Sequence, residues 1–185
     1  MRMANPSGFA ALQKKAPLVG AFFMLACWVS QAQAFCPAPS RAQWVAVRHV
    51  VDGDTVRLVD GRSVRLIGIN APEIGRKGQA DEPLAQAARK RLQALIKASD
   101  GRVGLVRGKE GKDRYGRSLA HLYSREGHNL EAQLLSEGLA YRIAIAPNTE
   151  LSGCQQRAES VARRAAVGVW KRSPVMPAHA VRKPG

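Results

Sequence analysis

Short stretches with the alternation of a β-strand follow one another closely after residue 43. They cover 44–51, 55–59 and 63–69, and Asp-Gly pairs at 52–53 and 60–61 separate them. An Asp-Gly pair between alternating segments is typical of a tight hairpin turn, and at 60–61 it predicts a type I′ turn. The pattern therefore predicts a three-stranded antiparallel meander, one face of which has to be covered by other parts of the chain.

The rest of the chain adds two strand patterns, at 103–106 and 119–123, with a glycine-rich charged loop between them. It also predicts three helices: Asp81 caps the first, Asn129 caps the second, and Thr149 opens the third. Five short strands with helices among and after them predict a β-barrel with flanking helices, an α+β fold. The five-stranded Greek-key barrel called the OB-fold fits this order, although strand number alone fits several barrels.

Residues 1–34 have the composition of a signal peptide that is cleaved off. A basic start without acidic residues precedes an apolar stretch at 17–29, which is too short to span a bilayer comfortably. Small residues at 32 and 34 then supply a cleavage pattern, which predicts a mature start at Phe35. A retained membrane anchor and lipidation of Cys27 are the alternatives. We expect an exported protein, periplasmic or secreted, without stable membrane association after cleavage.

The mature chain divides into a lead-in segment at 35–43, one domain at 44–171 and a basic tail at 172–185 that we expect to be disordered. Without residues 1–34 it keeps 26 basic and 14 acidic residues, a net charge of +12. A surplus this large favours a polyanionic partner, because each neutralised phosphate releases a condensed counterion. The alternative is a basic periplasmic protein whose charge only aids solubility. We expect a monomer.

Two cysteines, Cys36 and Cys154, remain after removal of the signal peptide. An even number of cysteines in an exported chain favours one disulfide. That bond would tie the mature N-terminus to the third helix. Two separate thiols are the alternative.

Carboxylate, amide and main-chain oxygens gather at two predicted turns. Asp52 and Asp54 lie at the first, and Asn70 and the carbonyl of Ala71 lie at the second. The histidines form no HxH or HExxH pair and there is no CxxC, which argues against zinc. Hard oxygen ligands favour calcium, with magnesium or manganese as lesser candidates. For the first turn taken alone, a hairpin without any metal is the alternative.

Two arginines and a glutamate complete the set of residues with chemical potential. Planar guanidinium groups match the oxygens of a phosphodiester, so Arg65 and Arg117 are candidates for binding one. Glu73 follows Pro72, which stiffens the loop, and its carboxylate could activate or orient a water molecule. Taken singly, each of these residues is more often an exposed surface charge than a catalytic group.

The four segments occur together in an order that resembles the staphylococcal nuclease (thermonuclease) family. They are 52–55 (DGDT), the strand with Arg65, 70–73 (NAPE) and 114–117 (RYGR), and the resemblance covers about residues 44–170. It implies an OB-fold enzyme that uses calcium to hydrolyse phosphodiester bonds in DNA and RNA and leaves 3′-phosphorylated products.

The resemblance also implies a role for each matching residue. Calcium would be held by Asp54, Asn70 and the Ala71 carbonyl, with Asp52 nearby. Glu73 would act as general base or water-orienting group. The remaining positions would bind substrate: Arg65 and Arg117 the scissile phosphate, Arg114 and Tyr115 the neighbouring phosphate or nucleotide.

Two departures from the family pattern stand out. Asn70 replaces an aspartate, and lower ligand charge predicts weaker calcium binding. The family's pair of tyrosines over the base is not matched: Ala144 and Ala146 lie near those positions and Tyr141 lies slightly upstream, as a substitute substrate-binding residue. A catalytically inactive nucleic-acid-binding barrel is therefore the alternative function, and an adhesion module on the basic surface is a weaker one.

Overall fold

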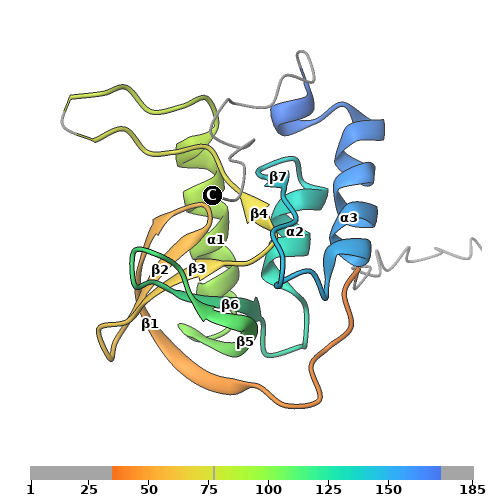
Figure 1. Ribbon diagram of the computed structural model, residues 1–185. Helices are drawn as coiled ribbons and strands as arrows, with labels where there is room; N and C mark the ends of the chain where they lie inside the picture. The colour runs from red at the N-terminus through yellow and green to blue at the C-terminus, as the bar shows by residue number, and fades with distance from the viewer. Residues whose placement is uncertain (1–34, 77, 172–185) are drawn as a thin grey trace, which may run out of the picture. The chain divides into compact units, whose positions relative to one another are not determined.

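A closed barrel of five strands forms the body of the part of the chain that this computed structural model describes, residues 35–76 and 78–171 (Figure 1). Its strands are β1 (Gln43–Asp52), β2 (Thr55–Leu58), β3 (Ser63–Leu66), β5 (Arg102–Lys112) and β6 (Ser118–Tyr123). They pair in the order β1-β2-β3-β6-β5 and back to β1, and only the β3–β6 pair is parallel. This is the topology of the OB-fold, so the predicted fold class is confirmed.

The hairpin between β2 and β3 differs from its prediction. Of its two expected turn residues only Gly61 has a positive φ, 90°, whereas a type I′ turn needs two. The Leu58 N–H instead donates to the Arg62 carbonyl at 2.9 Å, which closes a three-residue loop at 59–61. Asp60 braces this loop, because its carboxylate accepts hydrogen bonds from the Arg62 N–H and guanidinium at 3.0 and 2.7 Å.

Three α-helices cover the barrel in the described chain: α1 (Ala85–Ala98), α2 (Leu130–Ser136) and α3 (Ser152–Ala165). Asn129 caps α2 as predicted, and its side chain accepts a hydrogen bond from the Ala132 N–H at 2.9 Å. The predicted cap of α1 is wrong. Leu84 holds the N-cap position with a φ of 71°, while Asp81 accepts hydrogen bonds from the Gly75 N–H and the Gln86 side chain.

The third helix also begins at a different residue from the one predicted. It starts at Ser152, after Thr149, and its C-cap is Ala166 in the left-handed region with a φ of 49°. Gly168 opens the short 3-10 helix η1 (Gly168–Trp170). Trp170 is buried, so the chain returns to the body of the protein after α3.

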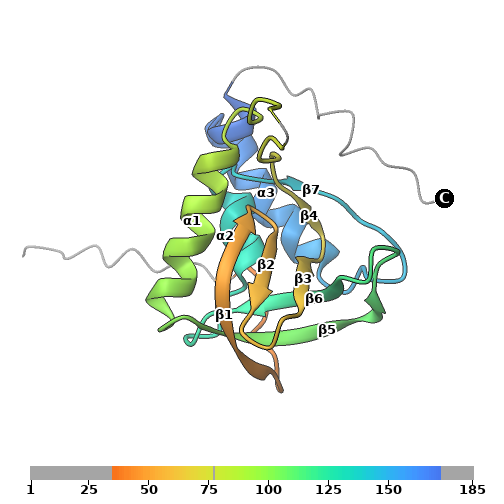
Figure 2. The same ribbon diagram turned by 90° about the vertical axis from the view of Figure 1, so that its left-hand side faces the viewer.

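The hydrophobic core joins the barrel interior to the helices. Inside the barrel lie alternate residues of the strands, among them Val56, Leu58, Val64, Leu66, Val103, Leu105 and Leu122. The helices add Ala88 and Leu92 from α1 and Leu134 and Leu135 from α2. Helix α2 lies between α1 and α3 and also packs against β6 (Figures 1 and 2).

A pair of very short strands, β4 (Ile69–Asn70) and β7 (Tyr141–Arg142), links the barrel to α3. The chain reaches β4 through Gly68, whose φ is 83° and whose face is covered by the Gln155 side chain. Gln155 also donates a hydrogen bond to the Ile67 carbonyl at 3.0 Å. Helix α3 therefore fixes the turn that delivers Asn70 to its position beside Tyr141.

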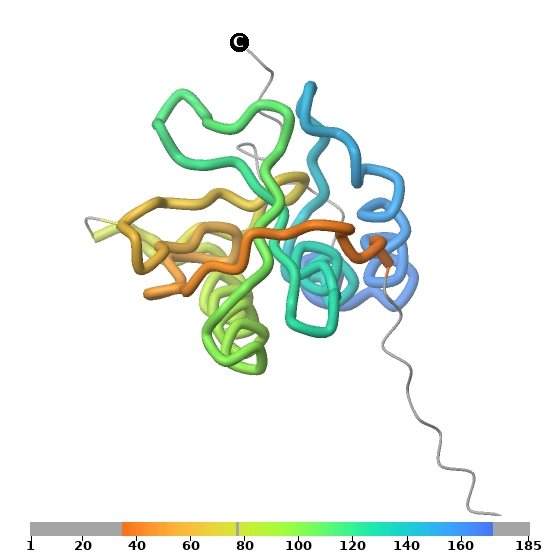
Figure 3. Tube along the Cα trace, turned by 90° about the horizontal axis from the view of Figure 1, so that it is seen from below, coloured from red at the N-terminus to blue at the C-terminus, as the bar shows by residue number. Residues whose placement is uncertain are grey.

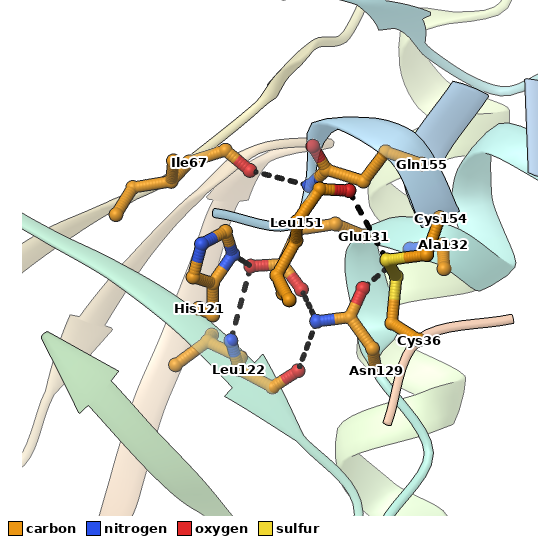
Figure 4. Close-up of a disulfide and its surroundings, with 10 residues drawn as sticks. All are labelled: Cys36, Ile67, His121, Leu122, Asn129, Glu131, Ala132, Leu151, Cys154 and Gln155. Carbon is orange, nitrogen blue, oxygen red and sulfur yellow. Dashed lines mark hydrogen bonds and ion pairs between the residues drawn. A yellow bond between two sulfur atoms is a disulfide. The ribbon is translucent and has the colours of Figure 1, made fainter. Parts of the chain in front are cut away.

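A disulfide joins Cys36 to Cys154, so the first described residues lie beside α3 (Figures 3 and 4). The lead-in segment ends where β1 begins, at Gln43. Among the described residues no helix combines the length and the apolar character needed to cross a membrane. The predicted signal peptide and basic tail lie outside the described residues.

Candidate active site

Polar residues of the β1–β2 turn, β3 and β4 form one hydrogen-bonded group around Asp54. One carboxylate oxygen of Asp54 accepts hydrogen bonds from the Thr55 hydroxyl, and the other accepts from the Ala71 N–H at 2.7 Å. Arg65 forms an ion pair with Asp54 and donates to the Asn70 side-chain oxygen at 2.8 Å. Asp54 is only 2% exposed, so nearly all of its contacts are with the protein. We call Asp54, Arg65 and Asn70 the buried cluster.

Close packing between the turn and α1 brings the two oxygen-bearing turns together. A Cβ atom at Gly53 would lie 2.5 Å from the Ala71 side chain and 2.6 Å from the Ala88 side chain. No other residue fits there without moving the helix. The DGDT turn thus packs directly on the start of the second turn and on α1.

Asp52 lies next to this cluster and carries an unbalanced charge. Its carboxylate accepts a hydrogen bond from the Asp54 N–H at 3.1 Å and is 4% exposed. Burial, and then the negative charges of Asp54 and Glu73, raise the pKa of Asp52 to about 7. The two buried carboxylates of Asp52 and Asp54 lie close together, and within the described chain the ion pair of Asp54 with Arg65 is the only one made by either of them.

A cleft of about 670 Å³ opens beside the buried cluster. Its walls come from the ends of β1 and β2, the β2–β3 hairpin, the loop after β4 and the β5–β6 turn. Four of the predicted site residues line it, namely Asp52, Glu73, Tyr115 and Arg117, and so does Thr55, the neighbour of Asp54. Further basic side chains in the wall are Arg57, Arg62 and Arg76, so the cleft suits an anion.

Glu73 is exposed at the edge of this cleft, and its loop is held at the base. The Glu73 N–H donates to the Glu82 carboxylate at 2.9 Å, and the Glu82 N–H donates to the Glu73 carbonyl at 3.0 Å. Asp81 adds a bond to the Gly75 N–H at 2.9 Å. The main chain of Glu73 is therefore fixed while its carboxylate faces the cleft and solvent.

Arg117 and Tyr115 reach the cleft from the β5–β6 turn. Asp113 holds Arg117 by accepting bonds from its main-chain N–H at 2.9 Å and from its Nε at 2.7 Å. Burial acts against ionisation, but the hydrogen bonds from Arg117 keep the pKa of Asp113 below its usual value. Tyr115 is 62% exposed, and the guanidinium groups of Arg114 and Arg117 lie 4.9 and 5.4 Å from its ring centre.

Tyr141, predicted to bind substrate, lies elsewhere. Only 6% of it is exposed, and its ring packs edge-on against Trp170 with the ring centres 5.3 Å apart. Burial raises its pKa. The phenol ring belongs to a small apolar cluster with Ala162 and Trp170, and this placement gives a base no surface to stack on.

The predicted metal ligands have the right chemistry for a hard cation. Oxygens of Asp54 and Asn70 already converge on one positive charge, the guanidinium of Arg65, and the carboxylate of Asp52 has none. No group of three His, Cys, Asp or Glu residues among the described ones could hold a metal. A calcium ion here would depend on amide and carbonyl oxygens and on water, which fits a weak site.

Sequence reasoning missed three residues that hold the site in place: Thr55, Glu82 and Asp113. Thr55 belongs to the DGDT segment, and Asp113 stands four residues before Arg117, a spacing that could have revealed their pairing. Nothing in the sequence indicates that Glu82 bonds to the Glu73 N–H, because the contact depends on how the loop folds back.

The barrel and its cleft define an OB-fold protein with a carboxylate and arginine site at its surface. Residues 63–172 match the family described as "Staphylococcal nuclease homologue", and the chain belongs to this family. The matched range contains Arg65, Asn70, Glu73 and Arg117, while Asp52 and Asp54 precede it.

Relatives among known proteins agree with this assignment. The chain is 30% identical to the "Thermonuclease" of Staphylococcus intermedius over 135 residues, which is 71% of this chain and 79% of that protein. It is 30% identical to the "Thermonuclease" of Staphylococcus hyicus over 132 residues, 69% of this chain and 76% of that protein. It is also 30% identical over 148 residues to "Endonuclease YhcR" of Bacillus subtilis (strain 168), of which it spans 12%.

Proposed function

We propose that this protein is an exported nuclease that hydrolyses phosphodiester bonds of DNA and RNA with the help of calcium. The observation that carries the proposal is the meeting of Asp52, Glu73 and Arg117 in one cleft, directly beside the buried cluster. Family membership supports nuclease activity in general, since the relatives named above are thermonucleases and an endonuclease.

The two arginines suit the charge that develops on the phosphate. When water attacks phosphorus, negative charge grows on the oxygens that do not bridge, and guanidinium donors stabilise it. Arg117 lines the cleft and can contact the phosphate as it stands, whereas Arg65 is engaged with Asp54 and Asn70 and is not among the residues that line the cleft. Arg65 then stabilises the charge of a phosphate that lies close to the buried cluster.

Glu73 is the group that we assign to the attacking water. Its exposed carboxylate lines the cleft and can accept the proton of a water molecule or orient it. The new P–O bond forms as the bond to the 5′-oxygen breaks, and the departing 5′-oxygen takes up a proton from solvent. The products are a 5′-hydroxyl and a 3′-phosphate.

Tyr115 and Arg114 are the residues that we assign to the neighbouring nucleotide. A tyrosine that is largely exposed beside a phosphate site offers a stacking surface for a base. Such stacking tolerates any base, which agrees with action on both DNA and RNA.

Calcium, held by Asp54, Asn70 and the Ala71 carbonyl with Asp52 nearby, would supply positive charge to the phosphate and the attacking water. Burial, and then the charge of Asp54, raise the pKa of Asp52, and a divalent cation would favour its charged form against both effects, which supports this assignment. Asn70 carries no charge, so we expect calcium to bind more weakly than it would with an aspartate there.

Export is supported by the signal-like pattern of residues 1–34 and by the Cys36–Cys154 disulfide, which is typical of oxidising compartments. We propose a monomer in the periplasm or the medium. Millimolar calcium outside the cell would fill even a weak site.

The test is cleavage of single-stranded DNA and RNA by the protein purified after expression of the full chain, with calcium or with excess chelator. We expect cleavage only with calcium and 3′-phosphate ends on the products. Glu73→Gln should lower kcat by about 10²–10⁴ without changing the melting temperature. Glu110→Gln, a change at an exposed carboxylate outside the cleft, is the matched control.

Each component of the proposal can fail separately. Cleavage that persists in chelator would reject the calcium requirement, and an unchanged rate in Glu73→Gln would reject the role of Glu73. A protein that binds single strands and never cleaves them would be the alternative, a catalytically inactive nucleic-acid-binding barrel.

A further inference from the structure

A second cavity, of about 520 Å³, lies against the cleft that holds Glu73 and Arg117. The two share part of their walls, namely Arg62, Ser63 and Gly116 of the β2–β3 and β5–β6 hairpins. The rest of the second cavity is lined by Arg107, Gly111, Lys112 and Ser118. The two cavities are therefore neighbours, so a nucleic-acid strand in the first cleft can extend toward the second.

The second cavity is basic and has hydroxyl groups in its wall. Arg62, Arg107 and Lys112 line it, and no carboxylate of the described residues does. Arg62 is engaged with Asp60, but within the described part of the chain no hydrogen bond or ion pair involves the side chains of Arg107 or Lys112. These two cations, beside the hydroxyls of Ser63 and Ser118, form a donor set for phosphate oxygens.

Arg107 and Lys112 are carried by the same barrel strand, β5. Arg107 lies opposite Ala120 and Lys112 lies opposite Ser118 in the β5–β6 ladder, with a register shift between them. Gly111 and Gly116 leave this end of the hairpin without side chains that would fill the space. The positions of Arg107 and Lys112 are thus set by strand pairing before any ligand arrives.

We propose that this cavity binds a second phosphate of the nucleic-acid strand, beyond the phosphodiester that lies in the cleft. Phosphate contacts position a strand without reading its sequence, which is what Arg107 and Lys112 are placed to do. The inference rests on the proposed function and deepens it. It gives the enzyme a preference for strands long enough to reach both cavities over dinucleotides.

The kinetic test compares a ten-nucleotide single strand with a dinucleotide as substrates of Arg107→Ala/Lys112→Ala. We expect the ratio of kcat/KM for the long strand to that for the dinucleotide to fall about tenfold, through a higher KM for the long strand. Arg102→Ala/Lys109→Ala is the matched control, because it removes the same charge from exposed positions of the same strand outside both cavities. This control should leave the ratio as it is.

A binding test makes the inference independent of catalysis. The affinity of the Glu73→Gln protein for the ten-nucleotide strand is measured at several salt concentrations, with and without the Arg107→Ala/Lys112→Ala change. The slope of log affinity against log salt should become shallower by about 0.7 for each phosphate of the single strand that the protein no longer neutralises. A melting curve of each variant checks that the fold is intact.

The outcomes separate this inference from the proposed function. If wild-type protein never cleaves but its binding depends on Arg107 and Lys112, the proposed function fails and the second phosphate site stands. If the protein cleaves and neither the length ratio nor the salt slope changes, the second site is refuted. Inorganic tripolyphosphate serves as the free-anion probe, and a variant that loses tripolyphosphate binding while strand binding is unchanged would also refute it.

Discussion

The buried cluster and the β5–β6 turn each pair an arginine with an aspartate. The two pairs differ in how exposed their side chains are and in how many partners hold them. In the cluster, the side chain of Arg65 is 13% exposed and that of Asp54 is 3% exposed, and each has several partners. At the turn, Arg117 is 33% exposed, Tyr115 is 62% exposed, and one aspartate holds the arginine. The charges of the cluster are therefore held in place, whereas the exposed side chains of the turn can change position to contact a substrate.

The two arginines are where this difference should be largest. Arg65→Ala leaves Asp54 buried without its cation, so we expect a loss of about 3–5 kcal/mol in the free energy of unfolding together with a fall in kcat of about 10³. Arg117→Ala should lower kcat comparably but cost under about 1 kcal/mol of stability. Denaturant melts and single-turnover rates measure both quantities. Equal destabilisation by the two changes would contradict the contrast between fixed and adjustable groups.

The Cys36–Cys154 disulfide lies outside the cleft and serves as a comparison, because it should affect stability without affecting catalysis. The bond closes a loop of 118 residues, and the chain-entropy treatment gives about 4–5 kcal/mol for a loop of that length. We expect Cys36→Ala/Cys154→Ala to lower the free energy of unfolding by up to that amount with kcat unchanged at temperatures where the variant is folded. A selective loss of kcat would mean that this bond shapes the cleft.

Tyr115 and Tyr141 allow a comparison between an exposed and a buried aromatic side chain. Tyr115→Ala should raise KM for single strands about 5–150-fold, because stacking of one base contributes roughly 1–3 kcal/mol. Tyr141→Phe keeps the ring that packs on Trp170, so KM should be unaffected. A larger KM effect at Tyr141 than at Tyr115 would reverse our interpretation of the site.

The smallest expected effect concerns Asp52, whose pKa rises from 3.8 to about 7 on folding. Because the folded-state pKa is raised, its contribution to stability is fully present below about pH 4 and is lost as the pH rises through 7. In chelator, Asp52→Asn should therefore raise the melting temperature at pH 8 by several degrees and change it little at pH 4. Calcium should remove that gain. An equal gain at both pH values would contradict the predicted pH dependence of the contribution of Asp52 to stability.

Local signals in the sequence predicted the parts of the fold that depend on near neighbours. Asn129 as a helix cap is such a case, because its partner Ala132 lies three residues away. The extension of β5 to Lys112 was not predicted, since glycines at 108 and 111 indicate a loop. In the structure the Asn148 side chain bonds to both the N–H and the carbonyl of Glu110, at 2.9 and 3.0 Å, and keeps this stretch extended.

The site shows the same division between features set by neighbouring residues and features set by residues distant in the sequence. The motifs predicted residues that line the cleft, such as Glu73 and Arg117. These two lie within the short motifs themselves, in the loop after β4 and at the β5–β6 turn. The motifs could not predict that Arg65 is occupied by Asp54, a partner eleven residues back across the β2–β3 hairpin. Tyr141 was misplaced because its environment is set by Trp170, which returns to it only after α3.

The bond between Cys36 and Cys154 encloses the whole barrel together with α1 and α2. A protease that cuts once in an exposed segment, such as 78–81 or 114–116, leaves two fragments that are still covalently joined. Nicked protein would migrate as one chain on a gel until a reductant is added, and then as two. The same tether keeps both fragments at high effective concentration, so a single cut need not end the working life of the molecule.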